Sequence, residues 1–172
     1  MGYTTDFEGK FNISPAMKDE HAEFINKFSE TRRMARNALA AGKLPDPLRE
    51  VTGLPVGIQG GYYVGDPSFA GQSKTPDILD YNQPPEGQPG LWCQWVVTEY
   101  GEQLEWNGAE KFYYYTEWLE YLIKHFFAPW GYTLNGEVTW QGEDRSDMGK
   151  LTVKDNKVKA LEGVVTYPGE DD

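Results

Sequence analysis

Apolar and polar residues alternate near the beginning of the chain and then change to a helical period. Residues 5–13 read TDFEGKFNI, with the apolar side chains on alternate positions, which predicts a strand. Ser14 and Pro15 follow as a helix N-cap and a first-turn proline, and residues 17–36 carry a narrow apolar stripe at helical spacing. The pattern therefore predicts a strand that leads into a helix.

The second half of the chain carries stronger patterns. Residues 91–106 are rich in aromatic and β-branched side chains and predict a hairpin. Across residues 109–127 the apolar side chains recur at i, i+3, i+4 and i+7, which predicts a helix that Pro129 ends. Residues 132–167 alternate again around an Asp155-Asn156 turn, and predict two or three antiparallel strands.

Between these halves the periodicity is lost. Eight of the eleven prolines lie in residues 38–90, so this stretch is predicted to be a long connection with little regular structure. Connections of this length are unusual in compact domains and are typical of binding surfaces or lids, although such a segment can also simply wrap the core.

The order of predicted elements is strand, helix, long loop, two strands, helix and three strands. This order favours an α+β fold, in which two helices pack on one face of a mostly antiparallel sheet. A ferredoxin-like β-α-β-β-α-β core with an added strand satisfies it. The length predicts a single domain, residues 1–172, with residues 38–90 as an insertion or wrapping loop.

Acidic side chains are concentrated in the later two thirds of the chain. The net charge is −11, yet residues 1–50 carry eight acidic and eight basic side chains. Residues 75–147 carry 13 acidic side chains against three basic ones, a balance that repels phosphate and favours a cationic partner or a metal ion. We therefore expect no direct binding to nucleic acid.

The sequence also predicts where the protein resides. No apolar run approaches the roughly 20 residues that a membrane span needs, and the first ten residues lack the apolar stretch of a signal peptide. We expect a cytoplasmic protein without membrane contact, located in the host cytoplasm if a phage encodes it.

Local catalytic motifs are missing from the sequence. The single cysteine, Cys93, stands among tryptophans and is interpreted as a small buried apolar group, and neither His21 nor His125 stands at a catalytic spacing from it. The glycines of residues 57–65 match neither GxGxxG nor GxxxxGK[ST]. We expect no catalytic residue, no metal ion and no cofactor.

Three groups of residues are candidate binding residues, and the first is aromatic. Tyr62, Tyr63 and Tyr81 lie in the glycine- and proline-rich stretch. Glycine lets main chain approach a ligand closely, and tyrosine offers both a ring face and a hydroxyl, so these residues can form a pocket for a planar ligand. The same residues also fit turns that are packed by aromatic side chains.

The second group is acidic. Glu137 and Gln141 share one face of a predicted strand with Thr139, and Glu143 and Asp147 lie in the loop that follows. Gathered carboxylates can bind Mg²⁺ or Ca²⁺, or can hold one acid at a raised pKa beside an ionised partner. The spacing does not match an EF-hand, and it also fits a solvated polar turn.

The third group lies on the predicted helix of residues 109–127. Its face opposite the apolar stripe carries Tyr114, Glu117 and Tyr121, with Trp118 at the border. Aromatic side chains among acids are typical of protein contacts, because they contribute large rigid areas at little entropic cost. The long loop can equally cover them.

Several blocks, taken whole, resemble a family of small acidic, functionally uncharacterised proteins encoded by bacteriophages and bacteria. The resemblance spans nearly the full chain and rests on MGYTTDFEGKFNISP, FSETRRMAR, LPDPLREVTGLPVGIQGGYYVG, DYNQPPEGQPGLWCQW and APWGYTLNGEVTWQGEDRSDMGKLTV. It implies a cytosolic, phage-associated accessory protein and carries over no catalytic residue.

Together these observations predict a phage-associated or bacterial accessory protein that engages or inhibits a host component through an acidic, aromatic surface. The predicted partner is a host protein or a small nucleotide-like ligand. Two alternatives stay open. One is a carboxylate- or metal-dependent hydrolase of a nucleotide-like ligand that uses Glu137, Glu143 and Asp147, and the other is a small-ligand sponge that binds without turnover.

Overall fold

A six-stranded antiparallel sheet forms the centre of the protein, in a computed structural model that describes residues 2–65 and 74–169. The strand order is β4-β5-β1-β6-β7-β8, and β1 and β6 pair along ten residues each. This arrangement confirms the predicted α+β class with a mostly antiparallel sheet. The strands are β1 (Thr5–Ser14), β4 (Trp95–Val97), β5 (Gln103–Trp106), β6 (Thr133–Gly142), β7 (Met148–Lys154) and β8 (Lys157–Glu162).

Two helices are shorter than the sequence pattern predicts. Helix α1 (Asp19–Glu30) ends before the predicted residue 36, because Thr31 is extended and its hydroxyl caps the last turn by donating to the Lys27 carbonyl oxygen at 2.7 Å. Helix α4 (Tyr115–Leu122) begins after Tyr114, whose φ of 59° is left-handed. A π-helical turn, Ile123–Phe127, continues α4 to the predicted end.

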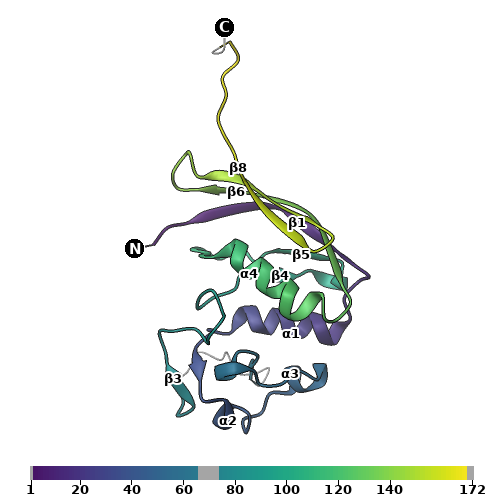
Figure 1. Cartoon of the computed structure of the whole chain (residues 1–172), viewed down its shortest axis with the longest axis vertical. Coiled ribbons are helices and arrows are strands. Elements are labelled where there is room, and N and C mark those ends of the chain that lie inside the picture. The colour runs from purple at the N-terminus through teal and green to yellow at the C-terminus, as the bar shows by residue number, and fades with distance from the viewer. Residues whose placement is uncertain (1, 66–73, 170–172) are drawn as a thin grey trace.

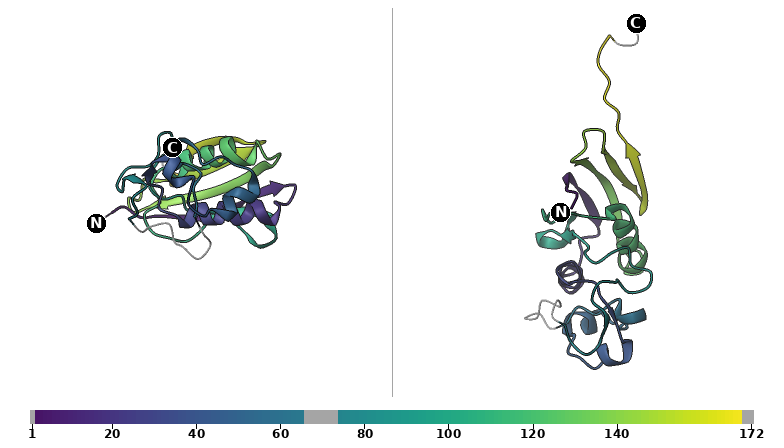
Figure 2. Two further views of the ribbon diagram at one scale, coloured as in Figure 1. Left: turned by 90° about the horizontal axis from the view of Figure 1, so that it is seen from below. Right: turned by 90° about the vertical axis from the view of Figure 1, so that its left-hand side faces the viewer.

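Residues 38–90 contain several short elements in place of one continuous loop. They are α2 (Ala38–Ala41), α3 (Pro47–Thr52), a 3₁₀ turn (Ile58–Gly60) and β3 (Ile78–Asp80), which pairs with β2 (Ala35–Arg36). Figures 1 and 2 show these short elements at the end of the molecule opposite the C-terminus, with α3 beside α1. The insertion therefore lies away from β6, β7 and β8.

Buried ion pairs fix the insertion. The Asp46 carboxylate accepts from Arg49 Nε at 2.6 Å and from the backbone N–H of Gly65 at 2.9 Å. Arg36 Nη1 donates to Asp77 Oδ2 at 2.6 Å, and both side chains are almost fully buried. Charged groups remain buried only when they are paired and hydrogen-bonded, so these contacts specify the path of the chain where apolar periodicity does not.

The main core lies between the sheet and the helices. It is built from large apolar side chains, among them Phe11, Phe24, Trp95, Leu119 and Phe126, each with no exposed surface. Burying each of these contributes roughly 2 kcal/mol to stability before entropic costs.

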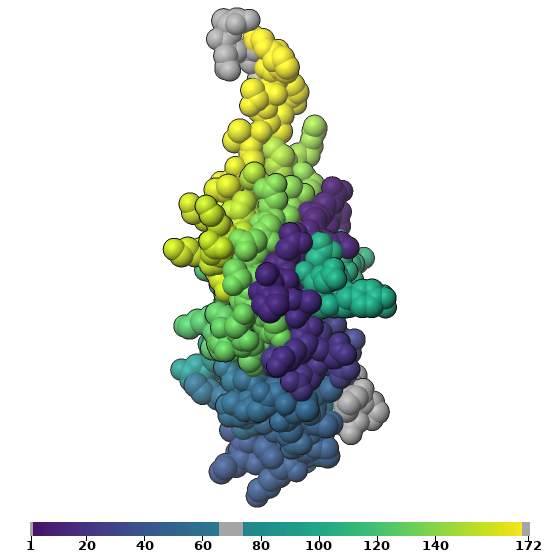
Figure 3. Space-filling model, turned by 90° about the vertical axis from the view of Figure 1, so that its right-hand side faces the viewer, coloured from purple at the N-terminus to yellow at the C-terminus, as the bar shows by residue number. Residues whose placement is uncertain are grey.

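Outside this core, residues 163–167, which follow β8, form no helix or strand, and Figure 3 shows this yellow segment standing away from the body of the molecule. In the part of the chain that the structure describes, no helix is both long enough and apolar enough to cross a bilayer.

Candidate functional site

Three exposed tyrosines gather where the start of β1 meets the loop before α4. Tyr3, Tyr113 and Tyr114 have exposed fractions of 36%, 47% and 57%. The backbone N–H of Tyr3 donates to the Tyr113 hydroxyl at 3.0 Å, which joins segments 110 residues apart in the sequence. We call Tyr3, Tyr113 and Tyr114 the tyrosine surface.

The loop that carries two of these tyrosines is held in an unusual conformation. Gln94 Nε2 donates to the backbone oxygen of Glu110 at 3.0 Å, and Trp106 Nε1 donates to that of Ala109 at 3.1 Å. Lys111 and Tyr114 both have positive φ, 62° and 59°. Such backbone conformations are costly for residues with a Cβ and cluster at functional sites, so the loop holds Tyr113 and Tyr114 outward at an energetic cost.

Tyr113 and Tyr114 line a pocket of about 520 Å³. Its walls are aromatic apart from Thr5 and a single carboxylate, and we call it the carboxylate pocket. The pocket is lined by Tyr3, Thr5, Phe112, Tyr113, Tyr114, Tyr115 and Asp147.

The carboxylate of this pocket is fixed by two neutral donors. Asp147 Oδ2 accepts from the Tyr3 hydroxyl at 2.7 Å, and Oδ1 accepts from Trp140 Nε1 at 2.9 Å. Burial, then the charges of Asp147 and Glu117, raise the pKa of Tyr115 to about 12. The hydrogen bond from the backbone amide of Asp144 lowers the pKa of Tyr3. The hydrogen bond of Tyr3 to Asp147, burial and the nearby carboxylates together outweigh this effect, so the pKa of Tyr3 is raised.

A second pocket, of about 630 Å³, is lined by the same two tyrosines. We call it the tryptophan pocket, because Trp92 lies in its wall together with two prolines and one ion pair, Glu110 with Lys111 at 3.0 Å. Tyr113 and Tyr114 thus line both pockets. The other lining residues are Gln83, Pro84, Pro89, Gly90, Leu91 and Gln94.

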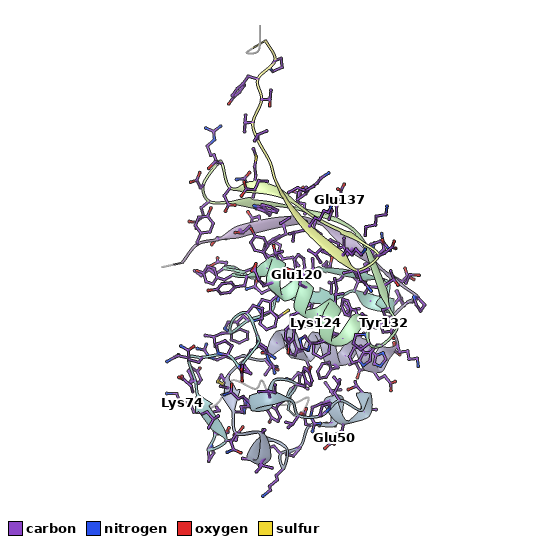
Figure 4. The ribbon with its side chains drawn as sticks, in the orientation of Figure 1. Glu50, Lys74, Glu120, Lys124, Tyr132 and Glu137 are labelled. Atoms are coloured by element: carbon purple, nitrogen blue, oxygen red, sulfur yellow. The ribbon has the colours of Figure 1, made fainter. Side chains whose placement is uncertain are left out.

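A third hollow, of about 690 Å³, runs over the outer face of the sheet across β1, β6, β7 and β8. Gln141 lies in it, whereas Glu137 lies outside it and forms an ion pair with Lys150 at 3.2 Å. Figure 4 shows Glu137 on the side of the sheet that faces away from the helices. The predicted shared strand face of Glu137 and Gln141 is thus observed, but the two side chains have different surroundings.

The acidic loop after β6 is a hydrogen-bonded turn. Glu143 Oε1 accepts from the backbone N–H of Thr4 at 3.1 Å, and Gln141 Nε2 donates to the backbone oxygens of Asp144 and Asp147 at 3.1 and 3.3 Å. Within residues 2–65 and 74–169, no three metal-ligating side chains gather in a group that could hold an ion.

The tyrosines of the first predicted group do not meet in one pocket. Tyr63 is buried beneath the guanidinium of Arg36, 4.5 Å from the ring centroid. Tyr62 shares a hydrogen bond of 2.7 Å with His125 Nδ1, and burial raises its pKa. Tyr81 is half-buried, and none of the three lines the hollows described above.

The third predicted group is divided by the insertion. Trp118 is fully buried and Tyr121 nearly so, because residues 84–91 cover them, with Gln88 Nε2 donating to the Tyr121 hydroxyl at 3.0 Å. Glu117 is exposed. Of the two interpretations that the sequence left open for this group, cover by the long loop holds for Trp118 and Tyr121, whereas Tyr114, which precedes the helix, is exposed.

The fold brings together two candidates from different groups, Tyr114 and Asp147, in the carboxylate pocket. Sequence reasoning missed Tyr3 and Tyr113. The run of three tyrosines at residues 113–115 was an available signal for Tyr113, whereas the place of Tyr3 depends on the register that pairs Thr5 with Gly142.

Comparisons with protein-family models, with curated proteins and with solved structures find no match to this chain. The geometry of its own residues is therefore the basis for a functional proposal.

Proposed function

We propose that this chain is a phage-associated or bacterial accessory protein that acts in the cytoplasm by binding, without catalysis, to a host protein. The binding face is the tyrosine surface with its two flanking pockets. One observation carries the proposal, which is that Tyr113 and Tyr114 are exposed on a tightly held loop and line two hollows, of about 520 and 630 Å³.

Exposed tyrosines that line pockets are suited to protein contacts. Tyrosine is enriched among the residues that dominate binding energy, because its ring buries a large area with only two side-chain torsions to immobilise. The two hollows that Tyr113 and Tyr114 line offer places for partner side chains to enter. The loop is already ordered by the bonds to Gln94 and Trp106, so little ordering entropy is lost on binding.

The charge around the tyrosine surface supports a basic partner. Residues 110–117 and 143–147 contribute five acidic and two basic side chains. Complementary potentials raise association rates and suppress wrong partners. This excess of acidic side chains near the exposed rings supports the proposal of a cationic partner.

An affinity experiment tests the proposal. Immobilised protein is exposed to bacterial lysate, and retained proteins are compared between wild type and the Tyr113→Ser/Tyr114→Ser double variant. A matched control, Tyr100→Ser/Tyr167→Ser, also removes two exposed tyrosines, with exposed fractions of 76% and 56%, from outside the pockets. We expect one partner whose binding to wild type is saturable and is weakened about 30-fold, or about 2 kcal/mol, by the double variant only.

Three outcomes contradict the proposal: no saturable partner, a partner that the double variant retains at full affinity, or an equal loss in the control. Circular dichroism of both variants establishes that each is folded before binding is compared.

For the fold, we further propose a ferredoxin-like core with both helices on one face of the sheet, extended by two strands. Support comes from the order β4-β5-β1-β6, in which every neighbouring pair is antiparallel, together with β7 and β8 added beyond β6. The helix layer in Figure 1 agrees with this arrangement.

A further inference from the structure

The carboxylate pocket combines ring faces with one oriented negative charge. Phe112, Tyr113, Tyr114 and Tyr115 supply aromatic walls, and Asp147 stands among them. The faces of aromatic rings carry negative electrostatic potential, so rings around a carboxylate attract a cation more strongly than either does alone.

Asp147 has capacity left for a cation. Its two bonds come from an O–H and an indole N–H, which orient the carboxylate without neutralising it. Each carboxylate oxygen has a further lone pair that can accept. In residues 2–65 and 74–169, Asp147 forms no ion pair with a lysine or arginine, and the ammonium of Lys111 is paired with Glu110.

The hydroxyls of Tyr3 and Tyr115 stay neutral at physiological pH. The pKa of Tyr115 is raised to about 12, and that of Tyr3 is raised as well. Asp147 is the only acidic side chain among the residues that line the pocket, and no basic side chain lines it, so an entering cation meets one carboxylate.

Resting on the proposed function, we infer that the carboxylate pocket receives an arginine side chain of the basic partner. A guanidinium is planar and weakly hydrated, so it stacks on rings and donates two parallel hydrogen bonds to a carboxylate. A lysine ammonium is more strongly hydrated and has no plane to stack. The protein itself uses guanidinium–ring stacking, with cation-to-centroid distances of 4.2 Å for Arg32 on Tyr81, 4.1 Å for Arg33 on Phe28 and 4.5 Å for Arg36 on Tyr63.

The test uses a short blocked peptide, acetyl-Gly-Arg-Gly-Arg-Gly-amide, with the full-length protein. The control peptides carry lysine or neutral citrulline in place of arginine. The indole N–H resonance of Trp140 serves as a local reporter, because this group donates to Asp147. We expect the arginine peptide to shift this resonance in a saturable way, the lysine peptide to bind several-fold more weakly, and the citrulline peptide to leave it unchanged.

Variants separate the pocket from the overall charge. Asp147→Asn keeps the shape of the side chain and removes its charge, and Tyr114→Leu removes an exposed ring without disturbing the core. We expect each to weaken the arginine peptide about fivefold or more. Glu120→Gln removes the same charge from the exposed face of α4 (Figure 4), outside the pocket, and is expected to leave the affinity unchanged.

Equal affinity for arginine and citrulline peptides, or an equal loss in Asp147→Asn and Glu120→Gln, overturns the inference. Its failure is distinguishable from that of the proposed function. If Tyr113→Ser/Tyr114→Ser loses the captured partner while Asp147→Asn keeps it, the arginine site is wrong and the binding face stands. If the arginine peptide binds but the tyrosine double variant keeps the partner, the proposed function is wrong.

Discussion

Two half-buried histidines are held in the same way in different parts of the protein. His21 Nδ1 shares a hydrogen bond of 2.7 Å with the Tyr132 hydroxyl, and His125 Nδ1 shares one of 2.7 Å with that of Tyr62. Each imidazole also stacks on a neighbouring ring at 4.0 Å between centroids. Burial lowers the pKa of both histidines, so the folded protein resists protonating them.

This arrangement predicts a loss of stability in mild acid. As pH falls through about 6.5, the histidines of the unfolded chain become protonated while those of the folded chain stay neutral. The unfolded state then binds more protons, so the free energy of unfolding decreases. The stabilising contribution is complete above that pH and is lost as pH falls toward the lowered pKa values. We expect His21→Asn/His125→Asn to flatten this slope between about pH 7.5 and 5.5, measured by urea unfolding. An unchanged slope would contradict the argument.

Asp46 provides a second prediction at the scale of a residue. It has no exposed surface, and it bonds Arg49 as well as the amides of Val64 and Gly65. Replacing it with alanine leaves Arg49 Nε and the two amides without their acceptor, although Arg49 Nη1 still donates to the Leu54 backbone oxygen at 2.7 Å. We expect Asp46→Ala to lower the free energy of unfolding by about 3 kcal/mol. Glu50→Ala, on the exposed side of helix α3, which Asp46 precedes (Figure 4), is the control. It is expected to change the free energy of unfolding by less than about 0.5 kcal/mol.

Among the elements, those stabilised by sequence-local patterns are predictable. β1 alternates buried and exposed residues as its sequence does, and the Asp155-Asn156 turn has the two positive φ values, 50° and 68°, that a tight hairpin needs. The elements of residues 38–80 depend instead on buried ion pairs between distant residues such as Arg36 and Asp77, which no periodicity reveals. For the same reason, the sequence leaves open whether the insertion covers Trp118 or leaves it exposed.

The hairpin of β7 and β8 packs against Trp140, whose indole bonds the carboxylate of the carboxylate pocket. A Cβ added at Gly149 would meet the backbone oxygen of Leu161 and the indole of Trp140, the same indole that bonds Asp147. We expect Gly149→Ala to cost about 2 kcal/mol in the free energy of unfolding and to weaken the arginine peptide by displacing Trp140. Gly163→Ala is the control, since its added Cβ first meets the flexible side chain of Met148 at 3.3 Å. Equal free energies of unfolding for the two variants would contradict the prediction, because they would show that β7 and β8 accommodate the added Cβ at Gly149 without loss of stability.

At the scale of the whole molecule, the acidic, aromatic binding surface stays a prediction from the sequence. Two of its candidate residues, Tyr114 and Asp147, line one pocket in the structure. Their meeting in one pocket depends on the register of β1 with β6, together with the path of the loop before α4. Long-range pairing of this kind is set by the whole fold, and a single sequence read locally does not contain it.

The net charge of −11 leads to a last prediction, about association kinetics. Long-range attraction of a basic partner acts before contact, whereas rings and hydrogen bonds act after it. Raising the ionic strength from about 0.05 to 0.5 M shortens the screening length from about 14 to 4 Å, so we expect the association rate constant to fall about tenfold or more. The dissociation rate constant should change far less, because it depends on the desolvated contacts of the tyrosine surface.

In stopped-flow measurements with the captured partner, Tyr113→Ser/Tyr114→Ser should show the opposite pattern, faster dissociation with an unchanged salt dependence of association. If salt acts instead on dissociation, the acidic surface contributes contacts and not attraction at a distance.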